Sequence, residues 1–279
     1  MKINIDKTEK FYLLNSTLID TKNEIPEISG ENKIFYEVIR VVKGKPLFLD
    51  EHLERLQQST ILSNIQCFNL YEVKYGIERL LKANYVEEKN LKLTFYCDNT
   101  NELKSNLFAY FVESHYPSEE AYLHGVRVEL MPMKRNNPNV KLENPLLRGS
   151  ADKLICLSQT HEVLLVNDHG FITEGSRSNF FAVYGNELIT PPSNQVLEGI
   201  TRKMVIQIAK DNSIECVEKE VHPSDIEKMD GAFITGTSSK VLPIARIGDY
   251  NFKSIPITTR KMIELYDQLV ERSLNEYNL

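Results

Sequence analysis

The sequence predicts a two-domain α/β protein, and three observations support this fold class. The chain has 279 residues, a length that allows one large domain or two smaller ones. Runs of β-branched and aromatic residues alternate with segments whose apolar residues recur at helical spacing. A polar segment with one proline, SHYPSEEA at 114–121, interrupts this pattern. We therefore expect a small α/β domain over 1–116 and a large domain over 122–279.

The first domain is predicted to be a sheet with helices. KIFYEVIRVV at 33–42 is rich in strand-forming residues, and Lys43-Gly44-Lys45 should turn the chain into a second strand, PLFL. Asp50 is expected to cap a helix over EHLERLQQSTIL. The further expected elements are a helix at 71–85 and strands at 91–97 and 106–113.

The second domain is predicted to mix strands and helices along its whole length. The expected elements are a strand at 125–132, a helix near 145–160, strands VLLVN and FITEG around a turn at 168–170, a hairpin of NFFAVY and ELITP across Gly185-Asn186, a helix from Gly199 to about Lys210, strands IECVEKEV and GAFITG, and an amphipathic helix near 257–276.

Composition argues against several classes of function. The net charge is −6, from 33 basic and 39 acidic residues, and no basic run suggests a nucleic-acid surface. No stretch of 18 apolar residues and no signal peptide is present, so we expect a cytoplasmic protein without a membrane partner. The four cysteines (Cys67, Cys97, Cys156 and Cys216) form no CxxC pair, which predicts no metal site and suits a reducing compartment.

Three segments of the second half carry the candidate functional residues. They are Lys141 after NNPNV, the run TEGSRSNFF at 173–181, and two turns, LEGITR at 197–202 and TGTSS at 235–239. Glycine and a hydroxyl residue at a helix start let N–H groups and the helix dipole approach a phosphate. A simple helix cap explains such a turn equally well, and neither turn matches a P-loop or GxGxxG. Taken alone, the residues indicate an α/β enzyme with a candidate phosphate site.

Taken together, these motifs resemble the signature of the fold-type IV (class IV) pyridoxal-phosphate-dependent aminotransferases. YEVIRVVKGKPLFLDEHLERLQQS is similar to the matching first-domain segment, so the resemblance extends from about Ile34 to Pro243. It implies a larger mixed domain with a barrel-like sheet, pyridoxal 5′-phosphate bound between the two domains, and a homodimer. The group includes branched-chain and D-amino-acid aminotransferases and 4-amino-4-deoxychorismate lyase.

The resemblance also implies a lysine that forms a Schiff base with the cofactor. In the family this lysine precedes the TEG glutamate by slightly more than thirty residues. Lys141 precedes Glu174 by 174 − 141 = 33 residues, whereas Lys153 precedes it by 174 − 153 = 21. Lys141 is therefore the predicted catalytic lysine, and it is the natural base to move the α-proton of the substrate.

The other cofactor-binding residues follow from the same resemblance. Glu174 matches the carboxylate that faces the pyridine nitrogen and strengthens the ring as an electron sink. Arg55 matches the arginine that binds the phosphate with a planar, bidentate donor. The remaining matches are Asn179, Leu197 against one face of the ring, Gly199, Ile200 and Thr201 at the helix start, and Gly236 and Thr237 at the second turn.

Substrate recognition is where the sequence departs from one branch of the family. D-amino-acid aminotransferases hold the substrate carboxylate with an Arg-x-His pair at the end of a first-domain strand, but LKLTFYCDNT contains no arginine. Tyr36 and Arg40 could face the pocket instead, or could simply alternate in a half-exposed strand. Arg135 could also reach the pocket from another loop. An L-amino acid donor, or an unusual amine, is therefore expected in preference to D-alanine.

The predicted function is transamination between an amino acid and a 2-keto acid. The alternative is 4-amino-4-deoxychorismate lyase, which releases pyruvate with the same lysine. A protein that binds the cofactor without turnover is a more remote alternative, because such a protein needs neither Lys141 nor Glu174.

Overall fold

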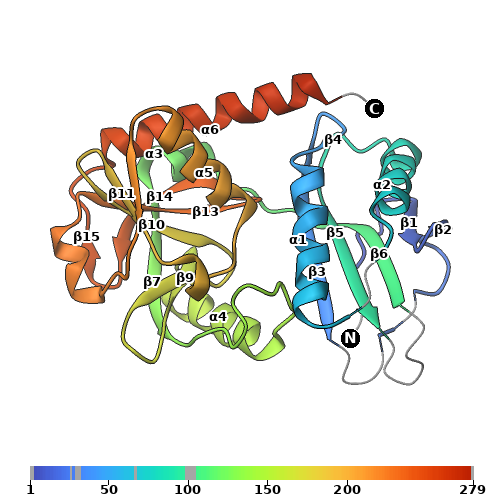
Figure 1. Ribbon diagram of the computed structural model, residues 1–279, viewed down its shortest axis with the longest axis horizontal. Helices are drawn as coiled ribbons and strands as arrows, with labels where there is room; N and C mark the ends of the chain where they lie inside the picture. Colours follow the sequence, from blue (N-terminus) through green and yellow to red (C-terminus); the bar gives the residue numbers. More distant parts are fainter. Residues whose placement is uncertain (1–2, 26, 29–32, 66–67, 98–104, 278–279) are drawn as a thin grey trace. The chain divides into compact units, whose positions relative to one another are not determined.

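The computed structural model describes residues 3–25, 27–28, 33–65, 68–97 and 105–277, and it folds into two compact units (Figure 1). The first unit comprises Met1–His115, Val140–Glu143 and Val270–Leu279, and the second comprises Tyr116–Asn139 and Asn144–Leu269. The short segment Val140–Glu143 therefore belongs to the first unit, although it follows the beginning of the second in the chain. This assignment places Lys141 on the first unit.

An antiparallel sheet in the order β2-β1-β6-β5-β3-β4 forms the centre of the first unit. Its strands are β1 (Phe11–Leu14), β2 (Thr17–Asp20), β3 (Ile34–Val42), β4 (Lys45–Pro46), β5 (Glu88–Cys97) and β6 (Ser105–Val112). β3 pairs with β5 along all nine of its residues, which confirms the strands predicted at 33–42 and 91–97. Leu142 bridges to Phe35, so the Val140–Glu143 segment runs beside the start of β3.

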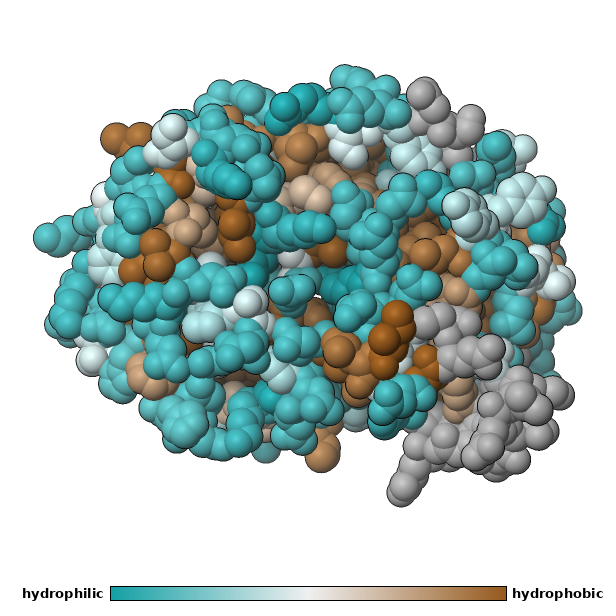
Figure 2. Space-filling model, in the orientation of Figure 1, coloured by the Kyte–Doolittle hydropathy of each residue, from teal (hydrophilic) through white to brown (hydrophobic). Residues whose placement is uncertain are grey.

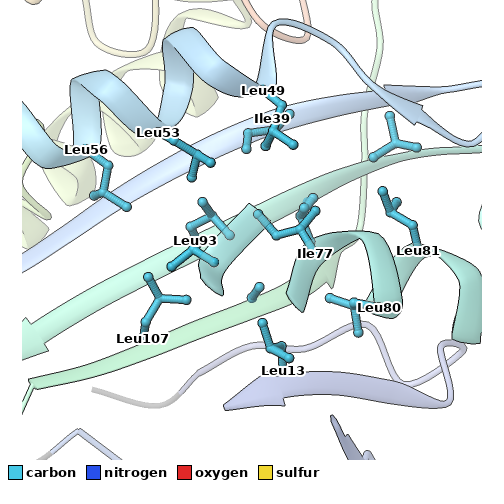
Figure 3. Close-up of a cluster of buried hydrophobic side chains, with 14 of the residues drawn as sticks. Leu13, Ile39, Leu49, Leu53, Leu56, Ile77, Leu80, Leu81, Leu93 and Leu107 are labelled. Atoms are coloured by element: carbon cyan, nitrogen blue, oxygen red, sulfur yellow. The ribbon is translucent and has the colours of Figure 1, made fainter. Parts of the chain in front are cut away.

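Two helices, α1 (Leu49–Leu62) and α2 (Leu70–Asn84), cover one face of this sheet. In α1 the leucines recur at helical spacing, and Figure 3 shows Leu49, Leu53 and Leu56 in a row along β3, with Leu49 beside Ile39. From α2, Ile77, Leu80 and Leu81 enter the same apolar cluster. Every second side chain of β3 and β5 thus points toward the two helices. The side chains between them point to the opposite face of the sheet.

The start of α1 differs from the sequence prediction. Its N-cap is Phe48 in the left-handed conformation (φ 53°, ψ 42°), and Asp50 lies inside the first turn, where it pairs with Lys74 of α2 at 2.8 Å. The predicted strand PLFL is correspondingly short, because only Lys45–Pro46 pairs with β3 before the chain turns into the helix.

The second unit is built on a mixed sheet in the order β12-β11-β10-β13-β14-β7-β8-β9, with β15 beside β14. Its strands are β7 (Val126–Pro132), β8 (Glu162–Val166), β9 (Ile172–Gly175), β10 (Asn179–Tyr184), β11 (Glu187–Thr190), β12 (Glu215–Glu218), β13 (Gly231–Gly236), β14 (Lys240–Ile247) and β15 (Tyr250–Asn251). An additional pairing of β9 with β10, in which Asn179 stands opposite Glu174, closes the strands from β10 round to β9 into a barrel. The predicted mixed, barrel-like sheet is confirmed.

The helices of the second unit lie mostly where the apolar spacing predicts them. They are α3 (Glu119–His124), α4 (Pro145–Ser158), η1 (Ser193–Gln195), α5 (Ile200–Asp211), η2 (Pro223–Lys228) and α6 (Ile257–Glu276), whose last residues group with the first unit. α3 begins inside the segment 114–121, which the sequence predicts to be without secondary structure. The reason is Ser118, whose side chain caps the helix by accepting from the Ala121 N–H group.

The surface drawn in Figure 2 is mostly hydrophilic, with apolar residues in separate patches. None of the helices in the described ranges is both long and apolar enough to cross a membrane. Cys97, Cys156 and Cys216 are free thiols, and Cys67 lies outside the described residues.

Candidate active site

Lys141 is held by its backbone on the sheet of the first unit. Its carbonyl accepts from the Tyr36 N–H group at 3.2 Å, and its own N–H donates to Oγ of the buried Ser59 on α1 at 3.2 Å. Val140 and Leu142 pack against the apolar cluster under the helices. The Leu142 N–H donates to the Val140 carbonyl at 3.0 Å, so the chain turns tightly at Lys141 and directs its side chain toward Tyr36. There its Nζ lies 4.6 Å from the centre of the Tyr36 ring.

Lys153, the alternative lysine, is exposed on α4. A solvent-exposed lysine on a helix has no feature that would bring a cofactor to it. Lys141, by contrast, is partly buried beside the Tyr36 ring.

Arg55 is held by a buried carboxylate that the sequence analysis did not identify. Its Nε and Nη2 donate to the two oxygens of Glu37 at 2.8 and 2.6 Å, and Nδ1 of His52 lies 2.8 Å from the same carboxylate. Burial raises the pKa of Glu37, but the charge and hydrogen bonds of Arg55 outweigh it and lower that pKa to about 2. A guanidinium carries five N–H donors, so Arg55 can bind Glu37 and a phosphate oxygen together.

The face that carries Lys141 also carries a second lysine. Lys92 of β5 stands opposite both Val38 and Tyr110, and its Nζ lies 5.0 Å from the centre of the Tyr36 ring. Its partner is Glu143 at 2.5 Å, and the two side chains are each only 21% exposed. Burial alone would lower the pKa of Lys92, but Tyr110 and Glu143 raise it above the ordinary value. The segment LKLTFYC thus contains no arginine but places an ammonium group in the middle of β5.

Arg40 lies on the same face of β3 as Tyr36 but farther along the strand. Four residues separate them, which is roughly 13 Å in an extended chain. Arg40 pairs with Glu88 at 2.6 Å, and Glu88 stands opposite Val42 at the far end of β3. The structure therefore brings Tyr36 to Lys141 and Lys92, and places Arg40 toward the other end of the sheet.

On the second unit, Glu174 is buried at the end of β9 and is ion-paired. Arg135 donates from Nε to Glu174 at 2.8 Å and from Nη2 to the Ser176 carbonyl at 2.8 Å. The other carboxylate oxygen accepts from the Leu197 N–H group at 3.3 Å. A guanidinium at this distance favours the ionised carboxylate, which is the form that can accept a hydrogen bond from a pyridinium nitrogen.

Asn179 and Glu174 together hold the segment that leads into α5. They are cross-strand partners at the seam that closes the barrel, and Asn179 donates to the Leu197 carbonyl at 2.8 Å. Both backbone polar groups of Leu197 are therefore bound by this pair. Gly199 follows in close contact, because a Cβ built on it would collide with Asn179 Oδ1. The sequence motifs TEG, SNFF and LEGIT thus converge on one seam.

The N-terminus of α5 is buried and lacks a side-chain cap. Gly199 is the N-cap, and Ile200 and Thr201 follow in the first turn with little exposure. Arg202 points away from this end and fixes the helix to the sheet, because it binds the Pro191 carbonyl at 3.0 Å and Glu218 at 2.9 Å. The first turn can therefore present its N–H groups and the Thr201 hydroxyl to an anion.

The second predicted turn connects β13 to β14. Gly236 pairs with Lys240 across the hairpin, and a Cβ on Gly236 would lie 2.9 Å from Ser239 Oγ. Just before it, the Thr235 hydroxyl is buried and has no hydrogen-bond partner among the described residues. Thr235 stands opposite Asn179, so this hydroxyl continues the row of polar side chains from Glu174. A chemical group with several hydrogen-bond acceptors could therefore bind to Thr235, Gly236 and Thr237.

The profile of the family described as amino-transferase class IV matches residues 34–247, which is most of the chain. This chain belongs to the class IV aminotransferases. It is therefore an enzyme that depends on pyridoxal 5′-phosphate and transfers amino groups between amino acids and keto acids.

Two curated relatives illustrate the range of this aminotransferase's family. A putative branched-chain-amino-acid aminotransferase from Methanocaldococcus jannaschii is 27% identical, over 93% of this chain and 96% of its own length. A D-alanine aminotransferase from Bacillus licheniformis is 28% identical, over 76% of this chain and 78% of its own. Because these identities are almost equal, they do not choose between the two substrate classes.

Solved structures show the same fold at lower identity. The branched-chain amino acid aminotransferase of Escherichia coli superimposes with a TM-score of 0.84 at 17% identity, covering 94% of this chain and 95% of that one. The branched-chain aminotransferase of Thermoproteus uzoniensis, solved with norvaline, gives 0.83 at 24% identity, covering 96% of this chain and 97% of that one. Another branched-chain amino acid aminotransferase of the same fold was solved with pyridoxamine 5′-phosphate.

The side chains present fit the chemical groups of pyridoxal phosphate. On the first unit, Lys141 offers the amine that an aldehyde needs, and Arg55 offers a guanidinium suited to a phosphate. On the second unit, Glu174 offers the carboxylate that a pyridinium needs, and the first turn of α5 and the β13–β14 turn offer N–H and hydroxyl donors suited to a phosphate. The buried Thr235 hydroxyl is an observation independent of any motif, because an unbound buried hydroxyl is costly and a bound ligand would satisfy it. Within the described ranges no cluster of His, Cys, Asp or Glu is placed to bind a metal ion.

Sequence reasoning missed Glu37, Lys92 and the contact of Arg135 with Glu174. A usable signal existed for two of them. Glu37 and Lys92 are the charged residues within the apolar alternation of FYEVI and NLKLTF, and a charge on a strand buried on both faces needs a partner. Arg135 offered no such signal, because it lies in a polar loop.

Proposed function

We propose that Lys141 of this aminotransferase forms the covalent link to pyridoxal phosphate and moves the α-proton, and that Lys92 binds the carboxylate of the amino acid. The observation that carries the proposal is the position of both ammonium groups over the ring of Tyr36, at 4.6 and 5.0 Å. A carboxylate bound by Lys92 would hold the α-carbon of the same molecule within reach of Lys141.

The role of each group follows from its surroundings. Bound pyridoxal phosphate supplies an aldehyde that takes the amino group and a ring that accepts electrons from the α-carbon. Two hydrogen bonds fix the backbone of Lys141, so its amine would stay close to the same position after a substrate had replaced it on the cofactor. Its amine would then be the base that takes up the α-proton of the substrate and holds it for return.

The remaining roles concern the cofactor. We assign the phosphate to Arg55 together with Gly199, Ile200 and Thr201 of α5 and with Gly236 and Thr237 of the β13–β14 turn. Glu174, supported by Arg135, holds the pyridine nitrogen protonated. Leu197 packs on the ring, and Asn179 positions Leu197 through its carbonyl. Arg40 is not assigned to the substrate, because its ion pair with Glu88 lies at the other end of β3.

Three wider expectations stay part of the proposal. The domains are taken as 1–116 and 122–279, the enzyme is taken to act as a homodimer, and the chain is taken to reside in the cytoplasm. 4-Amino-4-deoxychorismate lyase activity is the alternative outcome of a substrate screen, in which release of pyruvate from that compound without an amino acceptor would favour it.

Reduction with borohydride tests the assignment of Lys141. Wild-type enzyme loaded with cofactor and reduced should yield one labelled peptide, containing Lys141. Lys141→Ala should lose the label and the visible absorption band of the linked cofactor, because Lys92, the other amine over the Tyr36 ring, is ion-paired with Glu143. Lys153→Ala is the matched control and should keep both, since Lys153 is exposed on α4. A label on the peptide containing Lys153 would overturn the assignment.

A further inference from the structure

Glu143 places a carboxylate of the protein where the proposed function needs a carboxylate of the substrate. It lies two residues after Lys141, on the segment Val140–Glu143 that groups with the first unit. Its backbone N–H donates to the Ile34 carbonyl at 2.8 Å, which fixes the segment at this end. Its side chain reaches Lys92 at 2.5 Å.

The ion pair lies beside aromatic residues and beside the Lys141 ammonium group, which the proposed function reserves for the cofactor. Tyr36 lies with its ring near both lysines, and Tyr110, opposite Lys92, has its hydroxyl 3.1 Å from the Thr94 hydroxyl. Tyr110 is buried, which raises its pKa above the ordinary value. Two carboxylates that share one ammonium group in a largely desolvated place repel each other, and an unpaired buried charge is costly.

We propose that Glu143 is an internal competitor for the substrate carboxylate: it occupies Lys92 until an amino acid displaces it. This inference rests on the proposed function, because it requires Lys92 to bind the substrate. Glu143 keeps the lysine ionised and ordered when no substrate is present. The same contact weakens substrate binding, because the substrate carboxylate can bind Lys92 only after the ion pair between Glu143 and Lys92 is broken. The contact also makes the site selective for carboxylates, because a ligand without a carboxylate cannot form a new ion pair with Lys92 in place of Glu143.

The opposite role makes the opposite prediction. If Glu143 only positioned Lys92 for the substrate, removing its charge would weaken carboxylate binding. The variant Glu143→Gln retains the size of the side chain and an oxygen that can accept from Lys92, but it removes the negative charge. The sign of the change in carboxylate affinity therefore separates competition from positioning.

The experiment measures binding of 4-methylpentanoate, an apolar carboxylate without an amino group, to cofactor-loaded enzyme by calorimetry. Glu143→Gln should bind it roughly tenfold more tightly than wild type, the scale of one hydrogen bond to a charged group. The neutral amide 4-methylpentanamide is the matched probe, and its affinity should change little. For the best amino donor, KM should fall in the same variant by a larger factor than kcat changes.

The variant Lys92→Met separates failure of this inference from failure of the proposed function. If Lys92 binds the carboxylate, Lys92→Met loses affinity for 4-methylpentanoate, and Glu143→Gln has no effect in that background. Wild-type affinity in Lys92→Met would instead show that another group binds the carboxylate. With Lys92 established, an unchanged or weaker affinity in Glu143→Gln, including no detectable binding, overturns the competitor role.

Discussion

Glu37 shows how one residue can control a binding group without touching the ligand. It is fully buried, and it binds Arg55 through both oxygens while also contacting His52. Removing one partner from such a pair leaves a buried charge alone, which is far more costly than the net contribution of the pair. We therefore attribute the orientation of Arg55 to Glu37 rather than to the helix that carries the arginine.

The buried His52 predicts how stability depends on pH. Burial lowers the pKa of His52 below 6.5, although Glu37 opposes the shift, so the folded protein binds its proton less readily than the unfolded chain. Its contribution to stability is therefore complete above about pH 6.5 and is lost as the pH falls below that value. Glu37 acts in the same direction at lower pH, because its pKa of about 2 lies below the ordinary 4.5. The thermal midpoint should fall between pH 7 and pH 5, by roughly 2–4 °C for each kcal/mol lost.

Two substitutions test the origin of this pH dependence. His52→Gln keeps a donor for Glu37 but cannot titrate, so the midpoint should change less with pH than in wild type. His115 has a side chain that is 83% exposed, and His115→Gln should leave the pH dependence as it is. His161, whose pKa is also lowered by burial, accounts for part of the slope that remains in both variants. An unaltered slope in His52→Gln would contradict the explanation.

At the scale of elements, the seam between β9 and β10 connects two of the sequence motifs. Glu174 is the last residue but one of β9 and Asn179 begins β10, and both bind the backbone of Leu197 two residues before Gly199. The start of α5 is thus positioned by the seam as well as by its own residues. This arrangement explains why the segment LEGIT needs a glycine although its φ of −64° is open to any residue.

Gly199→Ala should therefore weaken cofactor binding more than it affects the fold. Its Cβ would collide with Asn179 Oδ1, so the amide must turn and release the Leu197 carbonyl. Loss of that contact and displacement of the first turn of α5 should raise the dissociation constant of pyridoxal phosphate roughly tenfold, as measured by titration of apoenzyme. Gly149→Ala on α4 is the control, because nothing lies within 4 Å of its Cβ. Equal dissociation constants in the two variants would show that the close contact is not needed.

At the scale of the whole molecule, the sequence predicted most elements because their patterns are local. The strand at 33–42, the helix near 257–276 and the hairpin across Gly185-Asn186 all follow from periodicity and turn residues, and the structure confirms them. The hairpin β1–β2 and the strand β14 were not predicted. Short or irregular strands of this kind owe their form to neighbours distant in the chain, such as β6 beside β1 and β7 beside β14.

The candidate site was predictable only in part, for a related reason. Motif spacing led to Lys141 and Glu174, but spacing does not reveal that Val140–Glu143 joins the sheet of the first unit. Without that pairing, Lys92 and Glu143 are 51 residues apart and show no relation to each other. Ion pairs between distant residues depend on the tertiary fold, and they are where the sequence interpretation was incomplete.

The choice of amino donor depends on where the whole chain holds the substrate carboxylate. The segment 90–113 has no arginine, and Lys92 supplies its positive charge within the described part of that segment. When the amine, the α-carbon and the carboxylate of a substrate are all held in place, only one face of the α-carbon is turned toward Lys141. The position of the carboxylate therefore selects the enantiomer that reacts.

With the carboxylate at Lys92 rather than at an arginine near the strand end, we expect L-leucine or L-glutamate to react faster than D-alanine, by about tenfold or more for one misplaced charged contact. Stopped-flow loss of the visible absorption band with each donor measures this directly. Lys92→Met should slow the preferred donor and reduce the difference between enantiomers, whereas a clear preference of the wild-type enzyme for D-alanine would mean that a different group binds the carboxylate.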